Sequence, residues 1–311
     1  MIILLFFQAM KKKDWLYYLL LVTSAALWGS SFIFTKRLLD AADPVVIICS
    51  RVMIAGPFFL LLCLFFFRKD MKIARKDIPI VFAFSCFEPF LYFIFETYSL
   101  TRCDASVVSI IVATIPIATA FLSMFYFKEN FTRLNLFGVF VSFTGIFLML
   151  FPAFLKASVS VLGIILAFGA VLSSVGYMFF LKKLPEHYNP IVIITYQNLI
   201  GLALFAPLMF IITDSHTIEN QLYTLFSAPQ LYYLASLAIL CSALAFMFYL
   251  QGMRHFGVGK ANTFTNLIPI VTAVLSFFLL QEKFPLYKVL GIIIVIVGIF
   301  LVQKKTQKRM P

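Results

Sequence analysis

Charged residues are scarce in this sequence of 311 residues. Asp, Glu, Lys and Arg make up 12% of the chain, against roughly 25% in an ordinary soluble domain. Hydrophobic residues make up 62%. These charged side chains are too few for the surface of a protein in water. The composition therefore excludes an ordinary soluble domain and indicates a protein surrounded by lipid.

Residues for metal binding and catalysis are also few. The five cysteines are an odd number and show no paired spacing, so neither a disulfide framework nor a cysteine metal site is indicated. His187, His216 and His255 are scattered over loops and helix ends and form no ligand cluster. There is no paired Asp motif and no Ser-His-Asp grouping at one depth, which argues against a membrane enzyme. We therefore expect no cofactor, no metal and no catalytic residue.

What the sequence has instead is a series of apolar runs of about 20 residues, the length of an α-helix that crosses roughly 30 Å of hydrocarbon. Barrel strands would be about ten residues long with alternating polarity, and irregular spans would leave backbone groups unpaired in lipid. The sequence therefore predicts an all-α integral membrane protein with ten transmembrane helices. The runs cover residues 15–38, 44–67, 78–100, 105–127, 134–151, 159–181, 190–213, 231–253, 258–280 and 286–302.

The basic residues indicate an orientation. With the N-terminus inside, the cytoplasmic segments hold 18 of the 25 Lys and Arg, the outer segments hold six, and Arg51 lies within the second helix. Cytoplasmic loops of membrane proteins carry an excess of Lys and Arg, so both termini are predicted to be cytoplasmic, in a multi-pass protein of the cell (inner) membrane. The net charge of +12 is explained by this topology and by attraction to anionic headgroups, without a nucleic-acid partner.

An internal repeat divides the chain. With a shift of 153, residues 115–148 align with 268–301 at 15 identities in 34 positions without a gap. A shift of 146 aligns DPVVII at Asp43 with NPIVII at Asn189. The matched pairs of the first alignment include Pro116 with Pro269, Glu129 with Glu282, Gly138 with Gly291 and Gly145 with Gly298.

The repeat predicts two halves of five helices, residues 1–153 and 154–311. Because five is odd, the second half enters the membrane from the opposite side, so the halves form an inverted-topology pair. Such pairs are the architecture of alternating-access transporters, whose site lies near the bilayer midplane between the halves.

The chain also resembles the ten-helix EamA-type members of the drug/metabolite transporter superfamily over its whole length. The likeness rests on LWGSSFIFTK at Trp28, the mid-helix Pro116 and Pro269, and the helix ends KENF and QEKF, each followed by a glycine-containing apolar helix. The family usually has Gly before each such Glu, where this chain has Lys128 and Gln281. The resemblance implies an exporter or exchanger of small metabolites, amino acids or drugs, with a cavity lined mainly by helices one, three, four, six, eight and nine.

The third predicted helix carries two acids within an apolar run. Glu88, Tyr92 and Glu96 are spaced four apart, so they share one face of the helix. An acid facing lipid costs about 2.5–3.5 kcal/mol on insertion scales, so this face is expected to look into the bundle or a wet cavity. Pro89 has no backbone N–H and predicts a bend beside Glu88.

The two acids are expected to differ in role. Glu96 and Arg51 lie at similar depths, roughly 7 to 11 Å below the outer surface at 1.5 Å per residue, which favours a structural ion pair. Glu88 has no basic residue at its own depth in the sequence. It is therefore a candidate for binding a proton or a cationic part of the substrate, and the alternative is a protonated carboxyl that acts as a structural strut.

Other candidates for substrate binding or coupling lie on the remaining cavity helices. Trp28 is near the midplane, where it either packs in the core or lines the cavity. Tyr177 is its counterpart on helix six, and the shift of 153 replaces Glu88 by Cys241 and Glu96 by Tyr249, so the second side of the cavity is expected to be neutral. Its polar groups would serve either helix packing or substrate binding. They are Tyr249 and Gln251 on helix eight and Asn262 and Asn266 on helix nine.

The sequence thus predicts a secondary transporter that acts by alternating access, as an exporter. Its expected partners are a small-molecule substrate and the lipid bilayer, with proton coupling as an open question, and it would work as a monomer or a homodimer. An exchanger or an uncoupled facilitator is the alternative. A channel or scaffold would need neither Glu88 nor the inverted repeat.

Overall fold

The computed structural model describes residues 14–126, 132–155, 160–185, 187–256, 261 and 264–303. Within these ranges the regular structure is helical throughout, which confirms the predicted all-α fold class. Six helices are long and apolar enough to cross a membrane, and four shorter apolar helices accompany them. The six are Trp15–Leu38, Pro44–Phe66, Ile78–Leu100, Val161–Leu181, Pro190–Ile212 and Gln230–Met253, and the four are Ala105–Thr119, Arg133–Leu148, Thr265–Leu279 and Leu286–Leu301. A count of ten spanning helices stays a prediction, because it requires the shorter helices to cross.

Several of these helices are subdivided. The first half contains α2 (Trp15–Leu38), α3 (Pro44–Phe66), η1 (Arg68–Asp70), α4 (Ile78–Ser85), η2 (Cys86–Leu91), α5 (Tyr92–Leu100), α6 (Ala105–Val112), α7 (Ile115–Tyr126) and α8 (Arg133–Leu155). The second half contains α9 (Val161–Leu181), α10 (Pro190–Ile212), α11 (Ser215–Leu225), α12 (Gln230–Ala235), η3 (Ser236–Leu244), α13 (Ala245–Phe256), η4 (Thr265–Leu267), α15 (Ile268–Leu279) and α16 (Leu286–Gln303). Of the predicted bend prolines, Pro116 is the second residue of α7 and Pro269 is the second residue of α15, each just after an interruption.

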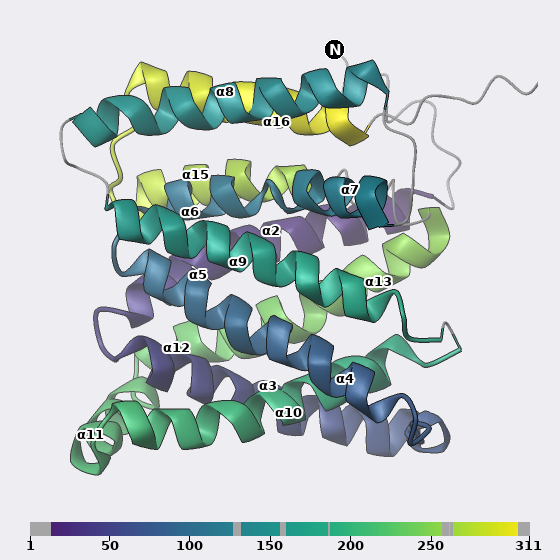
Figure 1. Ribbon diagram of the computed structural model, residues 1–311. Helices are drawn as coiled ribbons and strands as arrows, with labels where there is room; N and C mark the ends of the chain where they lie inside the picture. Colours follow the sequence, from purple (N-terminus) through teal and green to yellow (C-terminus); the bar gives the residue numbers. More distant parts are fainter. Residues whose placement is uncertain are drawn as a thin grey trace, which may run out of the picture.

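The helices run side by side between two ends of the molecule (Figure 1). We call the end that carries the α3–α4 and α9–α10 connections the basic end, at the right of Figure 1, and the end near α11 the opposite end. The main packing pairs each join one half to the other: α2 with α13 and α15, α3 with α10, α5 with α9, and α8 with α16. The centre of the bundle is therefore an interface between the halves.

Glycines let α8 and α16 approach to backbone contact. A Cβ added to Gly145 would lie 2.7 Å from the Val295 N and 2.8 Å from the Gly291 O, and one added to Gly298 would lie 2.7 Å from the Gly138 O. Small residues at such positions are typical of helix packing in lipid, where close backbone approach drives association. These two helices lie together along one side of the bundle (Figure 1), as expected for packing helices that do not line a cavity.

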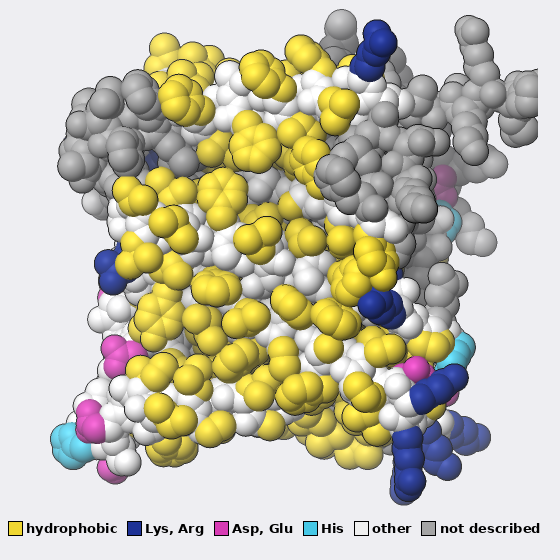
Figure 2. Space-filling view, in the orientation of Figure 1, with side chains coloured by type: hydrophobic (Ala, Val, Ile, Leu, Met, Phe, Trp, Pro, Cys, Tyr) yellow, Lys and Arg dark blue, Asp and Glu magenta, His cyan; other side chains and the backbone are white. Residues whose placement is uncertain are grey.

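The outer surface is apolar over the face seen in Figure 2, and charged side chains gather toward the two ends. Exposed aromatic residues include Phe65 (79% exposed), Phe66 (74%) and Phe140 (70%). A surface of this kind is stable only in contact with hydrocarbon, because monomeric soluble proteins rarely expose contiguous apolar patches beyond a few hundred Å². The chain is a multi-pass membrane protein whose sides contact the lipid bilayer.

A charged network joins the halves at the opposite end. The Glu282 carboxylate accepts hydrogen bonds from the backbone N–H of Ala105, at 2.8 Å, and from the Ser106 hydroxyl. The Lys288 Nζ lies 3.1 Å from Asp104 and 3.4 Å from Glu282, and only 5% of Lys288 is exposed. Glu282, one of the two glutamates matched by the repeat, thus places a negative charge at the N-terminus of α6 in the other half, where the helix dipole stabilises it.

Candidate functional site

The candidate site lies where the third helix of the first half is broken. Glu88 has φ −141° and ψ 120°, an extended conformation between α4 and α5, and Pro89 follows it without a backbone N–H. The bend predicted at Pro89 is present. Non-helical backbone at membrane depth is tolerated only where protein or a water-filled cavity surrounds it. The break therefore fixes Glu88 at a protein interior and not at the lipid surface.

The Glu88 carboxyl faces the second half of the chain. The hydroxyl of Ser174, on α9, interacts with this carboxyl. The Tyr177 hydroxyl, one turn further along α9, interacts with it electrostatically. Tyr177 also packs edge-on against Phe84 of α4, with ring centroids 5.7 Å apart. Ser174 lies three residues before Tyr177, a spacing that places both on one helix face.

Arg51 serves both acids. Its side chain is buried, and it attracts Glu96 and, more weakly, Glu88. Glu88 is thus within reach of the Arg51 charge. That no basic residue lies at the depth of Glu88 stays a prediction, since depth along single helices does not exclude attraction by a long arginine side chain. Among the charges of this site, two carboxylates face one guanidinium.

Arg51 and Glu96 do not form a direct ion pair within 4.0 Å in the described part of the chain. The Arg51 Nε donates to the Ser242 hydroxyl at 2.8 Å, and the guanidinium lies 4.1 Å from the centroid of the Phe93 ring. The Glu96 carboxylate, 5% exposed, accepts from the Tyr92 hydroxyl at 3.4 Å. The pairing of Arg51 with Glu96 is thus an attraction across a longer distance, and its energetic coupling stays a prediction.

The second half has a matching irregularity. η3 is a π-helical segment, and it contains Cys241, the residue that the shift of 153 aligns with Glu88. The Cys241 Sγ donates to the Leu27 carbonyl of α2 at 3.1 Å, and the Ser24 hydroxyl donates to the Ala245 carbonyl at 2.8 Å. Wide helical turns of this kind often occur at functional sites. Both third helices therefore depart from regular α-geometry at the same level of the repeat.

An aromatic group from the first and eighth predicted helices lies beside this segment. The Trp28 ring packs against Phe246 and Tyr249, with centroids 5.0 and 5.1 Å apart. Trp28, Tyr92, Tyr177 and Tyr249 are all half-buried. Trp28 thus belongs to an aromatic cluster that joins the halves, and both of its predicted roles, packing and cavity lining, are compatible with this position.

The other neutral candidates are separated. Gln251 is exposed and lines a shallow recess with Pro190 and Ile191 at the start of α10, so the structure does not bring it to Glu88. Asn262 lies outside the described residues. Asn266, in η4, is 1% exposed, and both its amide oxygen and its amide nitrogen lack hydrogen-bond partners among the described residues. A buried amide without partners is costly, so Asn266 is suited to binding a polar group or water.

Gln197 is a site residue that the sequence argument missed. It is 6% exposed, and its Oε1 has no partner in the described ranges. It lies one turn from Gly201, whose added Cβ would be 2.6 Å from Pro89, and one turn from Ile193, which packs with Phe84 of α4. Gln197 therefore faces the break at Glu88. The shift of 146 aligns it with Arg51, and this was the signal that could have found it.

The described residues contain no group of three or more His, Cys, Asp or Glu side chains able to hold a metal ion. Two carboxylates, one guanidinium, several hydroxyls and aromatic rings instead offer hydrogen bonds, a titratable carboxyl and faces for an organic ligand. Apolar side chains with a few polar groups of this kind are typical of residues that bind small molecules.

Comparisons with known proteins identify the family of the chain. The model of the EamA-like transporter family matches residues 15–151 and again residues 161–303. The uncharacterized transporter YetK of Bacillus subtilis is 26% identical over 283 residues, which cover 89% of this chain and 84% of that protein. An uncharacterized transporter of Archaeoglobus fulgidus is 25% identical over 264 residues, covering 85% of this chain and 90% of that protein.

A solved structure titled "Crystal structure of protein" superposes with a TM-score of 0.67 and covers 92% of this chain and 96% of its own, at 14% sequence identity. That likeness shows the fold alone. The two family matches together span most of the sequence, one in each half of the predicted repeat. The comparisons point to a transporter and not to an enzyme. The chain belongs to the EamA-like transporter family.

Proposed function

We propose that this protein is a secondary transporter that moves a small metabolite, such as an amino acid or a drug-like compound, by alternating access. It acts as an exporter in the cell (inner) membrane, with both termini in the cytoplasm. The observation that carries the proposal is the half-buried carboxyl of Glu88 at a helix break between the two halves. Broken helices at the interface of inverted repeats are where transporters hold substrate and coupling ions.

The residues around Glu88 support a site in which Glu88 exchanges its contacts when the two halves move. Ser174 and Tyr177 come from the second half, while the break and Arg51 come from the first. If one half rocks against the other, these distances change. No helical backbone hydrogen bonds at Glu88 need to break, because Glu88 is already outside helical geometry. The Gln197 oxygen, which has no partner within the described ranges, provides a further group that can bind in another state.

Two roles for Glu88 follow from this placement. In the first, its carboxyl carries a proton that couples export to the pH gradient. In the second, its carboxylate pairs with an amine of a cationic or zwitterionic substrate, with the rings of Trp28 and Tyr249 providing cation-binding faces. An exchanger or an uncoupled facilitator is the competing function, since neither needs a titrating carboxyl.

Transport by the Glu88→Gln variant tests these roles. The wild type and the variant are reconstituted in proteoliposomes, and uptake of amino acids and cationic drugs is measured with and without a pH gradient. Glu219→Gln is the matched control, because Glu219 is exposed on α11, away from the site. The control is expected to transport like the wild type.

If Glu88 carries the coupling proton, Glu88→Gln loses gradient-driven transport and keeps exchange down a concentration gradient. If Glu88 binds a substrate amine, the variant loses cationic and zwitterionic substrates and retains neutral ones. A folded Glu88→Gln protein with wild-type rates and wild-type pH dependence contradicts both roles and leaves Glu88 as a structural strut.

A further inference from the structure

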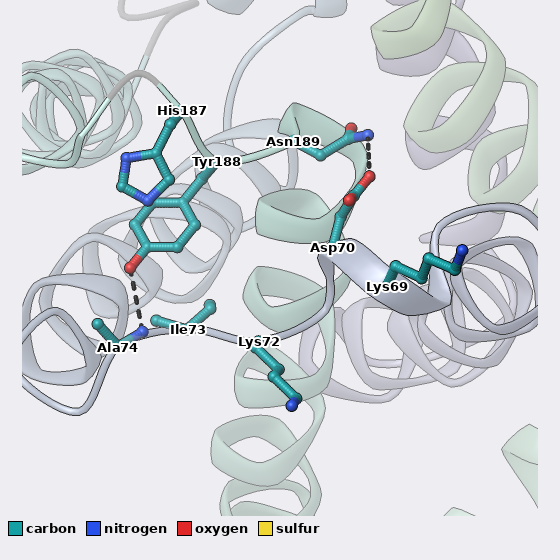
Figure 3. Close-up of a pocket in the computed structure, with 8 residues that line it drawn as sticks. All are labelled: Lys69, Asp70, Lys72, Ile73, Ala74, His187, Tyr188 and Asn189. Atoms are coloured by element: carbon teal, nitrogen blue, oxygen red, sulfur yellow. Dashed lines mark hydrogen bonds between the residues drawn. The ribbon is translucent and has the colours of Figure 1, made fainter.

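A groove of about 630 Å³ opens at the basic end, away from the Glu88 site (Figure 3). Both halves build it. The segment 69–74, between α3 and α4, forms one wall, and His187, Tyr188 and Asn189, just before α10, form the other. We call it the basic groove. It is an open recess between two connections, so a ligand can reach it from the water layer beside the membrane.

The walls of the basic groove are held together by hydrogen bonds between the halves. The Tyr188 hydroxyl accepts from the Ala74 N–H at 3.0 Å and donates to the Asp77 carboxylate at 2.7 Å. The Asn189 Nδ2 donates to the Asp70 carboxylate at 3.4 Å, and the Tyr196 hydroxyl donates to the Met71 carbonyl at 2.8 Å. Both acids of the segment 68–77 are thus engaged within the protein, and the groove has a defined shape.

The cations around the groove are in contrast unpaired. Five basic residues lie within nine positions, all exposed, and within the described ranges none of their side chains forms an ion pair or a hydrogen bond. They are Arg68, Lys69, Lys72, Arg75 and Lys76. Figure 3 shows Lys69 and Lys72 extending away from the two hydrogen bonds drawn there.

Three cations at the opposite end are instead bound within the protein. The Lys36 Nζ donates to the Cys103 carbonyl at 3.0 Å, the Arg37 guanidinium donates to the Leu279 carbonyl, and Lys288 pairs with two carboxylates. These side chains serve the fold. The cations at the basic groove have no such partners in the part of the protein that the structure describes. A dense group of cations on walls that hydrogen bonds hold in place favours an anionic ligand.

The N-terminus of α10 adds to the positive potential. Pro190 begins this 23-residue helix, and the Asn189 Oδ1 accepts from the Ile191 N–H at 3.1 Å, which places the first turn at the wall of the groove. Helix N-termini carry about half a positive charge and bind phosphate groups well. The groove therefore combines two ammonium groups and a helix end with one carboxylate, that of Asp70, which already accepts from the Asn189 Nδ2. The excess of positive charge suits a phosphate.

Exposed apolar side chains flank the same segment. Phe65 and Phe66 end α3 at 79% and 74% exposure, and Ile78 and Phe82 begin α4 at 52% and 50%. A free phosphate would use the cations alone. A lipid uses both features, because its headgroup lies at the level of the connection while its acyl chains lie against the apolar helix ends. Basic pockets beside membrane helices are known to bind anionic headgroups in this way.

We propose that the basic groove binds the phosphate headgroup of an anionic membrane phospholipid. The headgroup contacts Lys69, Lys72 and the start of α10, and the acyl chains cover the exposed ends of α3 and α4. Because the groove joins the two halves, the bound lipid also stabilises their contact at this end. This site is separate from the Glu88 site, and its occupancy does not depend on the transported substrate.

Binding of short-chain lipids to the purified full chain tests the proposal. Dioctanoyl phosphatidylglycerol, dioctanoyl phosphatidylcholine and inorganic phosphate are titrated into protein in a neutral detergent, and binding is followed by the shift in unfolding temperature and by calorimetry. The double variant Lys69→Gln with Lys72→Gln removes two groove cations. Its control is Arg102→Gln with Lys283→Gln, which removes two exposed cations at the opposite end.

The wild type and the control are expected to prefer the anionic lipid over phosphatidylcholine, and the groove variant is expected to lose about 10- to 30-fold in affinity for it. Inorganic phosphate is expected to bind more weakly than the lipid. Equal affinity for both lipids, or equal losses in the two double variants, overturns the site in favour of diffuse surface charge. Phosphate that binds as tightly as the lipid overturns the lipid assignment in favour of a soluble anion.

Discussion

Arg51 is a buried charge beside the candidate site. It is 8% exposed, donates to Ser242 and attracts both Glu96 and Glu88. Its position at the interface of α3 with η3 lets one guanidinium balance acids on another helix. Removing one member of a buried charged group costs more than removing two that balance each other, because a lone charge stays without compensation.

We expect Arg51→Ala to be less stable than the double variant Arg51→Ala with Glu96→Gln, by about 1–3 kcal/mol. The second change removes the acid that Arg51 attracts most strongly. Thermal unfolding of both variants and of Glu96→Gln alone, in one detergent, completes the double-mutant cycle. Losses that simply add would show that Arg51 and Glu96 are energetically independent.

Asp214 allows a residue-level prediction outside the membrane-spanning segments. It caps α11, and hydrogen bonds from the Thr217 side chain and backbone N–H hold the pKa of Asp214 below its ordinary value of 3.8. A carboxyl with a lowered pKa stabilises the folded state above its ordinary pKa, and this contribution is lost as the pH falls through the lowered pKa.

We therefore expect the amides of α11 to exchange faster with deuterium below pH 3.8, after correction for intrinsic rates, while they are protected near pH 7. Asp214→Asn keeps a capping oxygen without a titrating group, so its α11 should show little change over the same range. An equal acid response in the two proteins would assign the opening to other groups.

At the level of elements, the helices divide into regular packing helices and interrupted site helices. The α8–α16 pair is regular and depends on glycine, since Gly145 meets the backbone of α16 directly. The third helix of each half is interrupted instead, at η2 and at η3, and the polar contacts between the halves gather there. The helices that pack through glycine are thus different from the helices that hold the polar side chains of the candidate site.

Gly145→Ala is expected to lower stability by about 1–3 kcal/mol, because the new Cβ would lie 2.7 Å from the Val295 N and a backbone atom cannot rotate away. Gly56→Ala is the matched control. Its added Cβ would first meet the Leu199 Cδ2 at 3.6 Å, an ordinary contact. The midpoints of thermal unfolding are compared, and a Gly145→Ala midpoint equal to that of Gly56→Ala would mean that α8 and α16 separate readily.

For the whole molecule, the testable property is its orientation. The loops that end at the basic end carry the free cations of residues 68–76, and the positive-inside rule places such loops in the cytoplasm. Tags at both termini and in residues 68–76 are expected on the cytoplasmic side, and tags in residues 214–230 on the outside. Accessibility of each tag in intact cells measures this. A terminus found outside reverses the orientation, and termini on opposite sides exclude ten spans.

Much of the architecture could be predicted from the amino-acid sequence because lipid makes strong local demands. Each apolar run must satisfy its own backbone groups, so the predicted run 15–38 is the helix Trp15–Leu38, and 190–213 is nearly Pro190–Ile212. The acids at Glu88 and Glu96 and the bend at Pro89 could be predicted for the same reason, since charge and proline are conspicuous in an apolar helix.

The partners of those residues depended on the tertiary structure. Ser242 binds Arg51 across 191 positions, Ser174 meets Glu88 from α9, and Glu282 caps α6 from the other half. Helical spacing defines which residues share a face, but the rotation of each helix about its axis is set by packing against helices far away in the chain. For that reason Arg51 bonds to Ser242 and not directly to Glu96. For the same reason Gln251, which was predicted as a binding residue because it is polar, lies outside the Glu88 site.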